Sequence, residues 1–429
     1  MTTAVSKPRP LLAAALLGLL AEALFLFRLG FPHKQMFDEV YYVPAAKILW
    51  SLDHAYNIEH PLVGKELIGL GIHLFGDTSF GWRFPSTIAA SAVVTGVFAI
   101  GWLLFGRMRP AVVAGVLTIV NMTVFIQARI AMLDGFMAAF LVLSIAAMLW
   151  AMRGPTGVRW KLALAAMLLG LSAGAKWTAV PFLAFAALAF VVIRAHDARV
   201  AGRDLESILY ARGQRHWPGL PALEAMLILG VVSIATYFAT FAPAFFYAHD
   251  PMTWHSLLPF QLVMYHQQTQ ILPSHPYQSS WWSWPLDIRP IWYLYERADG
   301  AQRGVLMLGN PAVIWGGLVA VIACFYGWWR DGSWRLLGVA GLWLGSLAIW
   351  AIIPKSLGFF YYYYPSSIFL SLALAAAFDH FGWARKRHLE EWFVILAIGL
   401  FGYFYPIVSA QALPGPQSFQ YWMWLPTWP

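Results

Sequence analysis

Asp38 and Glu39 are adjacent carboxylates within QMFDEVYYVPAAK, the stretch from residue 35 to residue 47 that follows a strongly apolar segment. Only 11% of the chain is charged, so an acidic pair beside an apolar segment needs a physical reason. A carboxylate can take a proton from a reacting hydroxyl as a general base. Negative charge also stabilises a helix N-terminus, so the pair could instead cap the helix expected to follow. The two roles are compatible, and the sequence leaves both open.

Other ionisable residues lie in very short turns between apolar segments. QARIAMLD contains Arg129 and Asp134, GAKWT contains Lys176, and IPKSLG contains Lys355. A charge at membrane depth costs about 2.5–3.5 kcal/mol on insertion scales unless it is paired or hydrated. Charged residues nevertheless occur in all three of these turns, which are predicted to lie on the same side of the membrane. We therefore expect a shared polar cavity that opens outward and contains both signs of charge.

Each of these residues also has a structural alternative. Arg129 and Asp134 are five positions apart and could form an ion pair across their turn. Lys176 and Lys355 could be positive anchors at lipid headgroups. The remaining alternatives are interfacial anchoring by Arg83, pairing of His60 with Glu59 or Glu66, and an interfacial belt at the tyrosine run 361–364.

The composition indicates a polytopic membrane protein, because 60% of the 429 residues are hydrophobic and the mean hydropathy is +0.62. Lipid offers no water to unpaired backbone groups, so the apolar runs, each about 18–23 residues long, predict helices. The one cysteine, Cys324, excludes a disulfide within the chain. Eleven spans are expected, at about 10–28, 84–105, 111–127, 132–152, 160–175, 177–194, 222–244, 306–328, 335–353, 358–378 and 391–411.

Basic residues predict the orientation of these spans, because short loops rich in Lys and Arg face the cytoplasm. The net charge of +8 is thus a topology signal and gives no sign of nucleic-acid binding. We expect a cytoplasmic N-terminus, an extracytoplasmic C-terminus, and two long outer loops at 29–83 and 245–305. The first loop contains helix-like pieces at 40–52 and 62–75. The basic residues behind this orientation include Lys7, Arg9, Arg107, Arg109, Arg153, Arg159, Lys161, Arg330, Arg335, Arg385, Lys386 and Arg387.

The chain is expected to be a single integral membrane domain over residues 1–429, without a soluble domain. The segment 10–28 resembles a signal peptide, but no small-x-small cleavage site precedes the charged stretch that follows it. We therefore interpret it as a retained signal-anchor helix.

Seven motifs occur in a characteristic order: FDEVYYVPAAKILW (37–50), HPLVGKELIGLGIHLFGD (60–77), FGWRFPS (80–86), QARIAMLDGFMAAF (127–140), AKWTAVPFL (175–183), SWPLDIRPIWYLY (283–295) and YYYYPSSIFLSLALA (361–375). Their order and spacing resemble the protein O-mannosyltransferase family, family 39 of the glycosyltransferases. The resemblance implies the all-α, multi-span GT-C fold. It also implies transfer of a sugar, usually mannose, from a polyprenyl-phosphate carrier to serine or threonine hydroxyls of proteins at the outer or lumenal face.

The resemblance assigns roles residue by residue. Asp38 matches the catalytic base and Glu39 its neighbour, which would orient the acceptor or a basic residue. The donor's phosphate and sugar would be held by the residues that match the family's other motifs, with Lys355 added as a further cation: Arg129, Lys176, Lys355, His60, Lys65 and Asp134. The chain departs from the family at Leu62, where a second proline is usual, and at Asn121, where an acidic residue is common. Its tyrosine run replaces a stretch that often contains histidine, and its second loop has no room for the β-trefoil of eukaryotic members.

The reaction expected from this resemblance inverts the anomeric carbon, with Asp38 as base and fixed positive charge on the leaving phosphate. Arg129 is the first choice for that phosphate because its planar guanidinium matches the phosphate oxygens. The donor carries no diphosphate, so no metal is required, although the carboxylates leave room for a divalent ion. Two rivals stay open: a GT-C transferase that glycosylates a lipid or envelope glycan, as in lipid A modification, and, more remotely, a transporter. The expected location is a bacterial-type plasma membrane, with the site on the outer face.

Overall fold

The computed structural model describes residues 8–211, 213–382 and 387–429, and it is dominated by helices. Lys7, Arg385 and Lys386, which contributed to the predicted orientation, lie outside the described residues. Within the described part, eight helical segments are long and apolar enough to cross a membrane. They are α4 (Ser79–Phe105), α7 (Leu133–Met152), α8 (Val158–Ala175), Trp177–Val200 with α9 (Pro181–Val200), Ala222–Phe246 with α10 (Ala222–Leu227) and α11 (Ser233–Ala239), Ala312–Asp331 with α13 (Gly317–Asp331), Trp334–Ala351 with α14 (Trp334–Ala348), and α17 (Leu389–Val408).

Shorter helices complete the set and confirm the predicted helical membrane architecture. α1 (Pro10–Leu26), α5 (Met108–Ile119), α6 (Met122–Gln127) and α15 (Tyr364–His380) occupy the other expected spans. α2 (Glu39–Trp50) and α3 (Val63–Phe75) confirm the two helix-like pieces of the first long loop. α12 (Leu257–Gln268) lies in the second long loop.

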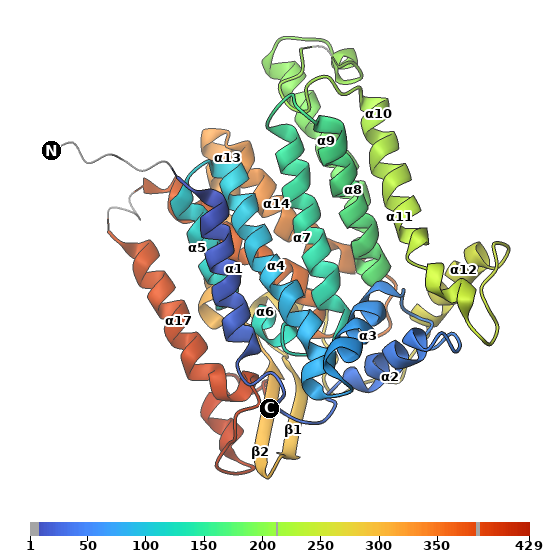
Figure 1. Cartoon of the computed structure of the whole chain (residues 1–429). Coiled ribbons are helices and arrows are strands. Elements are labelled where there is room, and N and C mark those ends of the chain that lie inside the picture. The colour runs from blue at the N-terminus through green and yellow to red at the C-terminus, as the bar shows by residue number, and fades with distance from the viewer. Residues whose placement is uncertain (1–7, 212, 383–386) are drawn as a thin grey trace.

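The elements of both long loops lie at one end of the helix bundle (Figure 1). α2, α3 and α12 are at this end together with a β-hairpin and the C-terminus, whereas α1 begins at the opposite end. Backbone hydrogen bonds join the two loops, from Ala248 N to Leu52 O at 2.7 Å and from His249 N to Asp53 O at 2.9 Å. Segments separated by about two hundred residues therefore form one structural layer over the ends of the spans.

The expected span 111–127 is wrong as a single helix, because the chain breaks between α5 and α6. Asn121 caps α6, and its side chain accepts a hydrogen bond from the backbone N of Thr123 at 3.2 Å. Its Nδ2 also donates to the carbonyl of Ser367 at 3.0 Å. A buried break of this kind is tolerated because a side chain replaces the lost backbone partners.

The expected span 306–328 is also wrong at its start, because residues 301–307 form a strand. β1 (Ile291–Ala298) and β2 (Ala301–Met307) pair antiparallel, with Ala298 opposite Ala301. The turn residues Asp299 and Gly300 both have positive φ, as a two-residue hairpin turn of type I′ requires. The helical part of this span begins only at Ala312.

Candidate functional site

Asp38 lies directly before α2 and is half-buried. Its backbone carbonyl accepts hydrogen bonds from the N atoms of Tyr41 and Tyr42, both at 3.0 Å, so the residue starts the helix through its main chain. Asp38 is the N-cap residue, but its side chain makes no capping hydrogen bond, so the helix N-terminus does not occupy this carboxylate. Among the described residues, no hydrogen bond or ion pair occupies the Asp38 carboxylate. It is thus available to a substrate.

Glu39 has the opposite environment, since it is fully buried and all its acceptor positions are used. Arg83 Nε and Nη2 donate to the two carboxylate oxygens, each at 2.8 Å. The backbone N atoms of Met36 and Ala131 donate to them at 3.0 and 2.9 Å. Glu39 therefore joins the start of α2 to α4 and to the turn before α7. Arg83, with 0% exposure, is a buried partner, so its interpretation as an interfacial anchor is wrong.

Lys176 follows α8 and forms a buried ion pair with Asp134 at the start of α7. Its Nζ lies 2.8 and 2.7 Å from the two Asp134 oxygens. The proposed pairing of Asp134 with Arg129 is therefore wrong. The Nζ also lies 5.4 Å from the ring centroids of both Tyr361 and Tyr362, where aromatic faces attract a cation.

Arg129 uses its guanidinium on backbone carbonyls. Nη1 donates to the carbonyls of Phe25 and Phe27 at 2.7 and 2.6 Å, and Nη2 donates to that of Arg28 at 3.0 Å. The side chain therefore fixes the end of α1. These bonds leave Arg129 poorly placed for the phosphate role first expected of it, and that role stays untested.

His60 and Lys65 organise the first loop in different ways. Lys65 is 1% exposed, and its Nζ donates to the carbonyls of Tyr56 (3.3 Å), Asn57 and His60 (2.8 Å). Lys65 therefore holds the loop together from within. His60 packs edge-on against Tyr42, with ring centroids 5.7 Å apart, and its buried Nδ1 has no partner within the described residues. The expected pairing of His60 with an acidic neighbour is absent there, and Asn57 Nδ2 donates to Glu59 at 2.5 Å instead.

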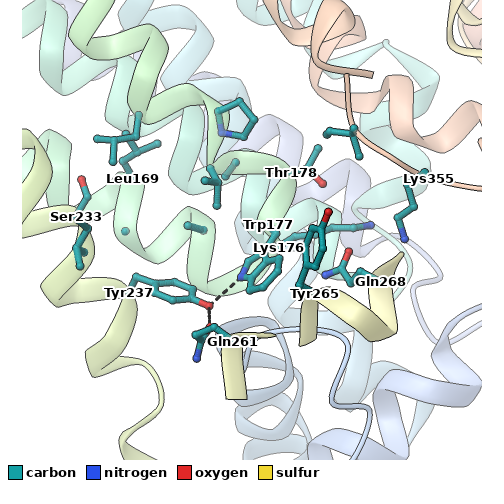
Figure 2. A pocket seen from close by; sticks show the side chains of 18 of the residues that line it. Leu169, Lys176, Trp177, Thr178, Ser233, Tyr237, Gln261, Tyr265, Gln268 and Lys355 are labelled. Carbon is teal, nitrogen blue, oxygen red and sulfur yellow. Dashed lines mark hydrogen bonds between the residues drawn. The ribbon is translucent and has the colours of Figure 1, made fainter. Parts of the chain in front are cut away.

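A cavity of about 550 Å³ begins between the spans and ends at two lysines (Figure 2). Figure 2 shows Leu169 and Ser233 at one end, and Lys176 and Lys355 at the other. Most of the wall is apolar and comes from α8, α9, α11, α12 and the loop after α14. The described residues make no hydrogen bond or ion pair with Lys355 Nζ. The cavity therefore combines an apolar channel with a cationic end.

Asp38 does not line the cavity, but its charge and the charges of Lys176 and Lys355 influence one another. Burial raises the pKa of Asp38 to about 7, and the positive charge of Lys176 opposes that rise. Burial, together with the positive charge of Lys176, lowers the pKa of Lys355 to about 8. A general base and a cation with these pKa values are both in their active charge states only near neutral pH.

The dependence of kcat/KM on pH is expected to be bell-shaped. Rate should rise as pH passes about 7, because Asp38 loses its proton and becomes a base, and should fall above about 8, because Lys355 loses its charge. A pH series of sugar-transfer rates at low donor concentration measures both limbs. A profile that is flat from pH 5 to pH 9 would contradict the pairing of these two groups.

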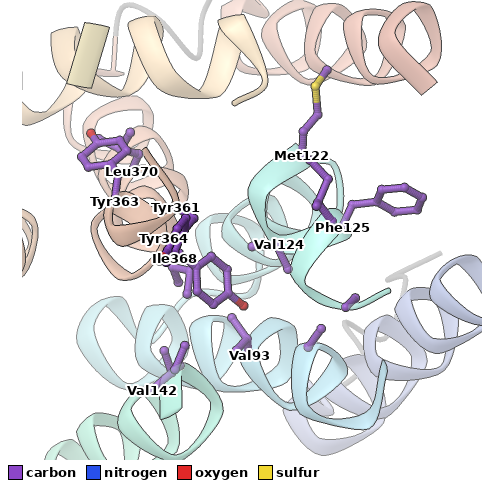
Figure 3. Close-up of a cluster of buried hydrophobic side chains, with 14 of the residues drawn as sticks. Val93, Met122, Val124, Phe125, Val142, Tyr361, Tyr363, Tyr364, Ile368 and Leu370 are labelled. Carbon is purple, nitrogen blue, oxygen red and sulfur yellow. The ribbon is translucent and has the colours of Figure 1, made fainter. Parts of the chain in front are cut away.

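Tyrosines around Asp38 include one that the sequence reasoning missed. Tyr293 of β1 stacks on Phe37, with ring centroids 4.2 Å apart and planes at 17°, and accepts a hydrogen bond from Gln127 Nε2 at 3.3 Å. Tyr361 and Tyr364 lie among the buried side chains of α4, α6 and α15 (Figure 3). The tyrosine run is buried, so its interpretation as an interfacial belt is wrong.

Within the described residues, no group of three or more His, Cys, Asp or Glu side chains is placed to hold a metal ion. The prediction that the reaction needs no metal is not tested by this observation.

Two family models match the chain. Residues 59–213 match the model described as dolichyl-phosphate-mannose-protein mannosyltransferase, and residues 253–428 match the C-terminal four-helix membrane region of protein O-mannosyltransferase. Together they include His60, Lys65, Arg129, Asp134, Lys176 and Lys355.

Curated and structural relatives agree with these models. A Mycobacterium tuberculosis polyprenol-phosphate-mannose–protein mannosyltransferase is 28% identical over 92% of this chain and 86% of the relative. A Sodalis glossinidius undecaprenyl phosphate-α-4-amino-4-deoxy-L-arabinose arabinosyl transferase is 28% identical over 42% of this chain and 30% of the relative. The Saccharomyces cerevisiae protein O-mannosyltransferase Pmt1–Pmt2 complex bound to the sugar donor gives a TM-score of 0.80 at 14% identity, covering 100% of this chain and 93% of that one. This likeness shows the GT-C fold. The two family models, which together match residues 59–213 and 253–428, show that the chain belongs to the protein O-mannosyltransferase family.

Proposed function

We propose that the chain transfers mannose from a polyprenyl-phosphate carrier to serine or threonine hydroxyls of proteins, on the extracytoplasmic face of a bacterial plasma membrane. The observation that carries this proposal is the Asp38 carboxylate, which has no hydrogen bond or ion pair to any described residue and is electrostatically coupled to Lys176 and Lys355 at the end of an apolar cavity. A lipid-linked phosphosugar needs this combination, because its tail is apolar, its phosphate is anionic and its acceptor must lose a proton. The identity of the sugar is supported by the name of the mycobacterial relative.

In the proposed reaction the polyprenyl tail lies along the apolar wall, and the phosphate lies at the cationic end. Lys355 and His60 interact with the phosphate, while Lys176 keeps its position through Asp134 and adds a fixed positive charge. Asp38 takes the proton of the acceptor hydroxyl as its oxygen attacks the anomeric carbon. The bond from that carbon to the phosphate oxygen breaks, and the polyprenyl phosphate leaves with the bonding pair. Attack from the side opposite the leaving group inverts the anomeric centre.

In this proposal Glu39 has a positioning role and does not contact the substrate. Its bonds to Arg83 and to the two backbone N atoms hold the residues on either side of Asp38 in place. Arg129 fixes the end of α1, which precedes this segment in the chain. Lys65 fixes the loop that carries His60.

An assay with a panel of donors and acceptors tests the proposal. Membranes that contain the full chain are supplied with polyprenyl-phosphate mannose, glucose or aminoarabinose, and with a serine/threonine peptide or an envelope lipid. Mannose on the peptide is the expected product. Sugar found only on lipid would contradict the protein acceptor and favour the second candidate, a transferase to lipid, for which the partial match to the Sodalis glossinidius enzyme is the specific observation.

Lys355→Gln is expected to raise the donor KM about tenfold or more, because a charge-assisted hydrogen bond to phosphate is lost. Initial rates against donor concentration, at saturating peptide, measure the change. Lys34→Gln is the matched control, since Lys34 is 49% exposed and pairs with Glu296 of the hairpin. Equal donor KM values for Lys355→Gln and the unaltered chain would remove Lys355 from the phosphate site.

A further inference from the structure

A second cavity adjoins the first one at Lys355. Its volume is about 350 Å³, and its walls come from residues 278–284 and 350–358. Three residues line both cavities: Trp350, Ile353 and Lys355. The two cavities therefore meet at the lysine that we place against the donor phosphate.

The lining of the second cavity is chemically different from that of the first. It contains hydroxyl and amide groups beside indole rings, supplied by Gln278, Ser279, Ser280, Ser356, Trp281, Trp282 and Trp284. These segments lie in the loops beyond the ends of the spans. Trp282 is 63% exposed, so this cavity has an edge at the protein surface.

Trp350 connects the second cavity to the region of Asp38. Its ring stacks on Tyr362, with centroids 4.4 Å apart and planes at 16°, and meets the edge of Trp284 at 5.5 Å. Tyr362 in turn lies beside Lys176. Trp350 is only 9% exposed, and its Nε1 has no hydrogen-bond partner within the described residues. A buried N–H without an acceptor costs free energy, so this donor is suited to a ligand.

We propose that the second cavity binds the acceptor polypeptide, as an extended segment beside the serine or threonine that receives the sugar. The inference rests on the proposed function, in which the donor fills the first cavity and the acceptor arrives from water. An extended chain offers carbonyl oxygens to a donor such as Trp350 Nε1, while Lys355 Nζ stays with the phosphate of the sugar donor. Aromatic-lined grooves bind polyproline-type segments, because this extended conformation is preformed and loses little conformational entropy on binding.

Two variants of the full chain in membrane vesicles test this site. Trp282→Ala removes an exposed indole, and Trp350→Phe removes the unpartnered N–H while a ring remains against Tyr362. Each is expected to raise the KM for a serine/threonine peptide about tenfold. In Trp282→Ala the donor KM should stay unchanged, because Trp282 lines only the second cavity. Trp392→Ala is the matched control, because Trp392 is 65% exposed on α17 and lines neither cavity.

The possible results distinguish an error in the acceptor site from an error in the proposed function. An unchanged peptide KM in Trp282→Ala and Trp350→Phe overturns the acceptor site. A raised donor KM with an unchanged peptide KM also overturns it, because the cavity then serves the donor's sugar. If the unaltered chain glycosylates lipid and no peptide, the proposed function fails and this assignment falls with it. A thermal-unfolding measurement on each variant distinguishes these results from misfolding.

Discussion

Asp38→Asn is expected to lower sugar transfer by about 10²–10⁴-fold while donor binding persists. Asparagine has nearly the same shape as aspartate but cannot accept the acceptor's proton. The Asp38 side chain makes no hydrogen bond or ion pair in the described structure, so the change should leave the fold intact. Transfer to peptide and binding of labelled polyprenyl-phosphate mannose are measured on the same preparation.

Asp77→Asn is the matched control for this experiment. Asp77 lies in the same loop and pairs with Lys47 at 2.9 Å, where its side chain is 49% exposed. Normal turnover is expected from this control. If Asp38→Asn also turned over normally, Asp38 would not be the base. Loss of donor binding together with turnover would instead place Asp38 in donor recognition.

Arg83→Leu is expected to destabilise the protein by about 3–5 kcal/mol and to abolish transfer. The substitution leaves the buried Glu39 carboxylate without its cation, and an uncompensated buried charge is costly. Arg83 also donates to the carbonyls of Pro32 and Lys34, at 2.8 Å each, so the segment before Asp38 loses its anchor. Thermal unfolding in detergent measures the loss of stability.

The double variant Arg83→Leu/Glu39→Leu should be more stable than Arg83→Leu alone, because it removes the unpaired charge. Arg335→Leu provides the control, since Arg335 is an exposed residue of α14 for which the structure describes no ion pair. If Arg83→Leu unfolded at the temperature of the unaltered chain, the network around Glu39 would contribute little to stability. An inactive double variant with restored stability would show that the pair positions Asp38.

Hydropathy predicted most of the fold because lipid permits few backbone structures. It could not locate the break at Asn121, since one polar residue in an apolar run is equally consistent with an unbroken buried helix. The hairpin was missed although a signal was present: Asp299 and Gly300 form the dipeptide favoured in two-residue turns, between runs rich in aromatic and β-branched residues.

The different roles of the charged residues in the site could not be predicted from the sequence. Asp38 and Glu39 are neighbours in sequence and both acidic, yet within the described part of the chain the first carboxylate has no bonding partner and the second is fully bonded. The difference arises from Arg83 and from the backbone N of Ala131, 44 and 92 residues away from Glu39. Similarly, the sequence suggests that Arg129 binds phosphate, but its guanidinium N–H groups donate to backbone carbonyls at the end of α1. Sequence spacing identified the charged residues and could not show which of them already had partners.

The apolar cavity has a consequence for how the enzyme encounters its donor. Its wall includes Val180 and Ile234, which are both 51% exposed on helices long enough to cross the bilayer. A polyprenyl carrier that enters from this side diffuses in two dimensions, and the relevant concentration is its mole fraction in the lipid. Adding inert lipid at a fixed total amount of donor should then slow the reaction, as in surface dilution, while diluting the vesicles with buffer should not.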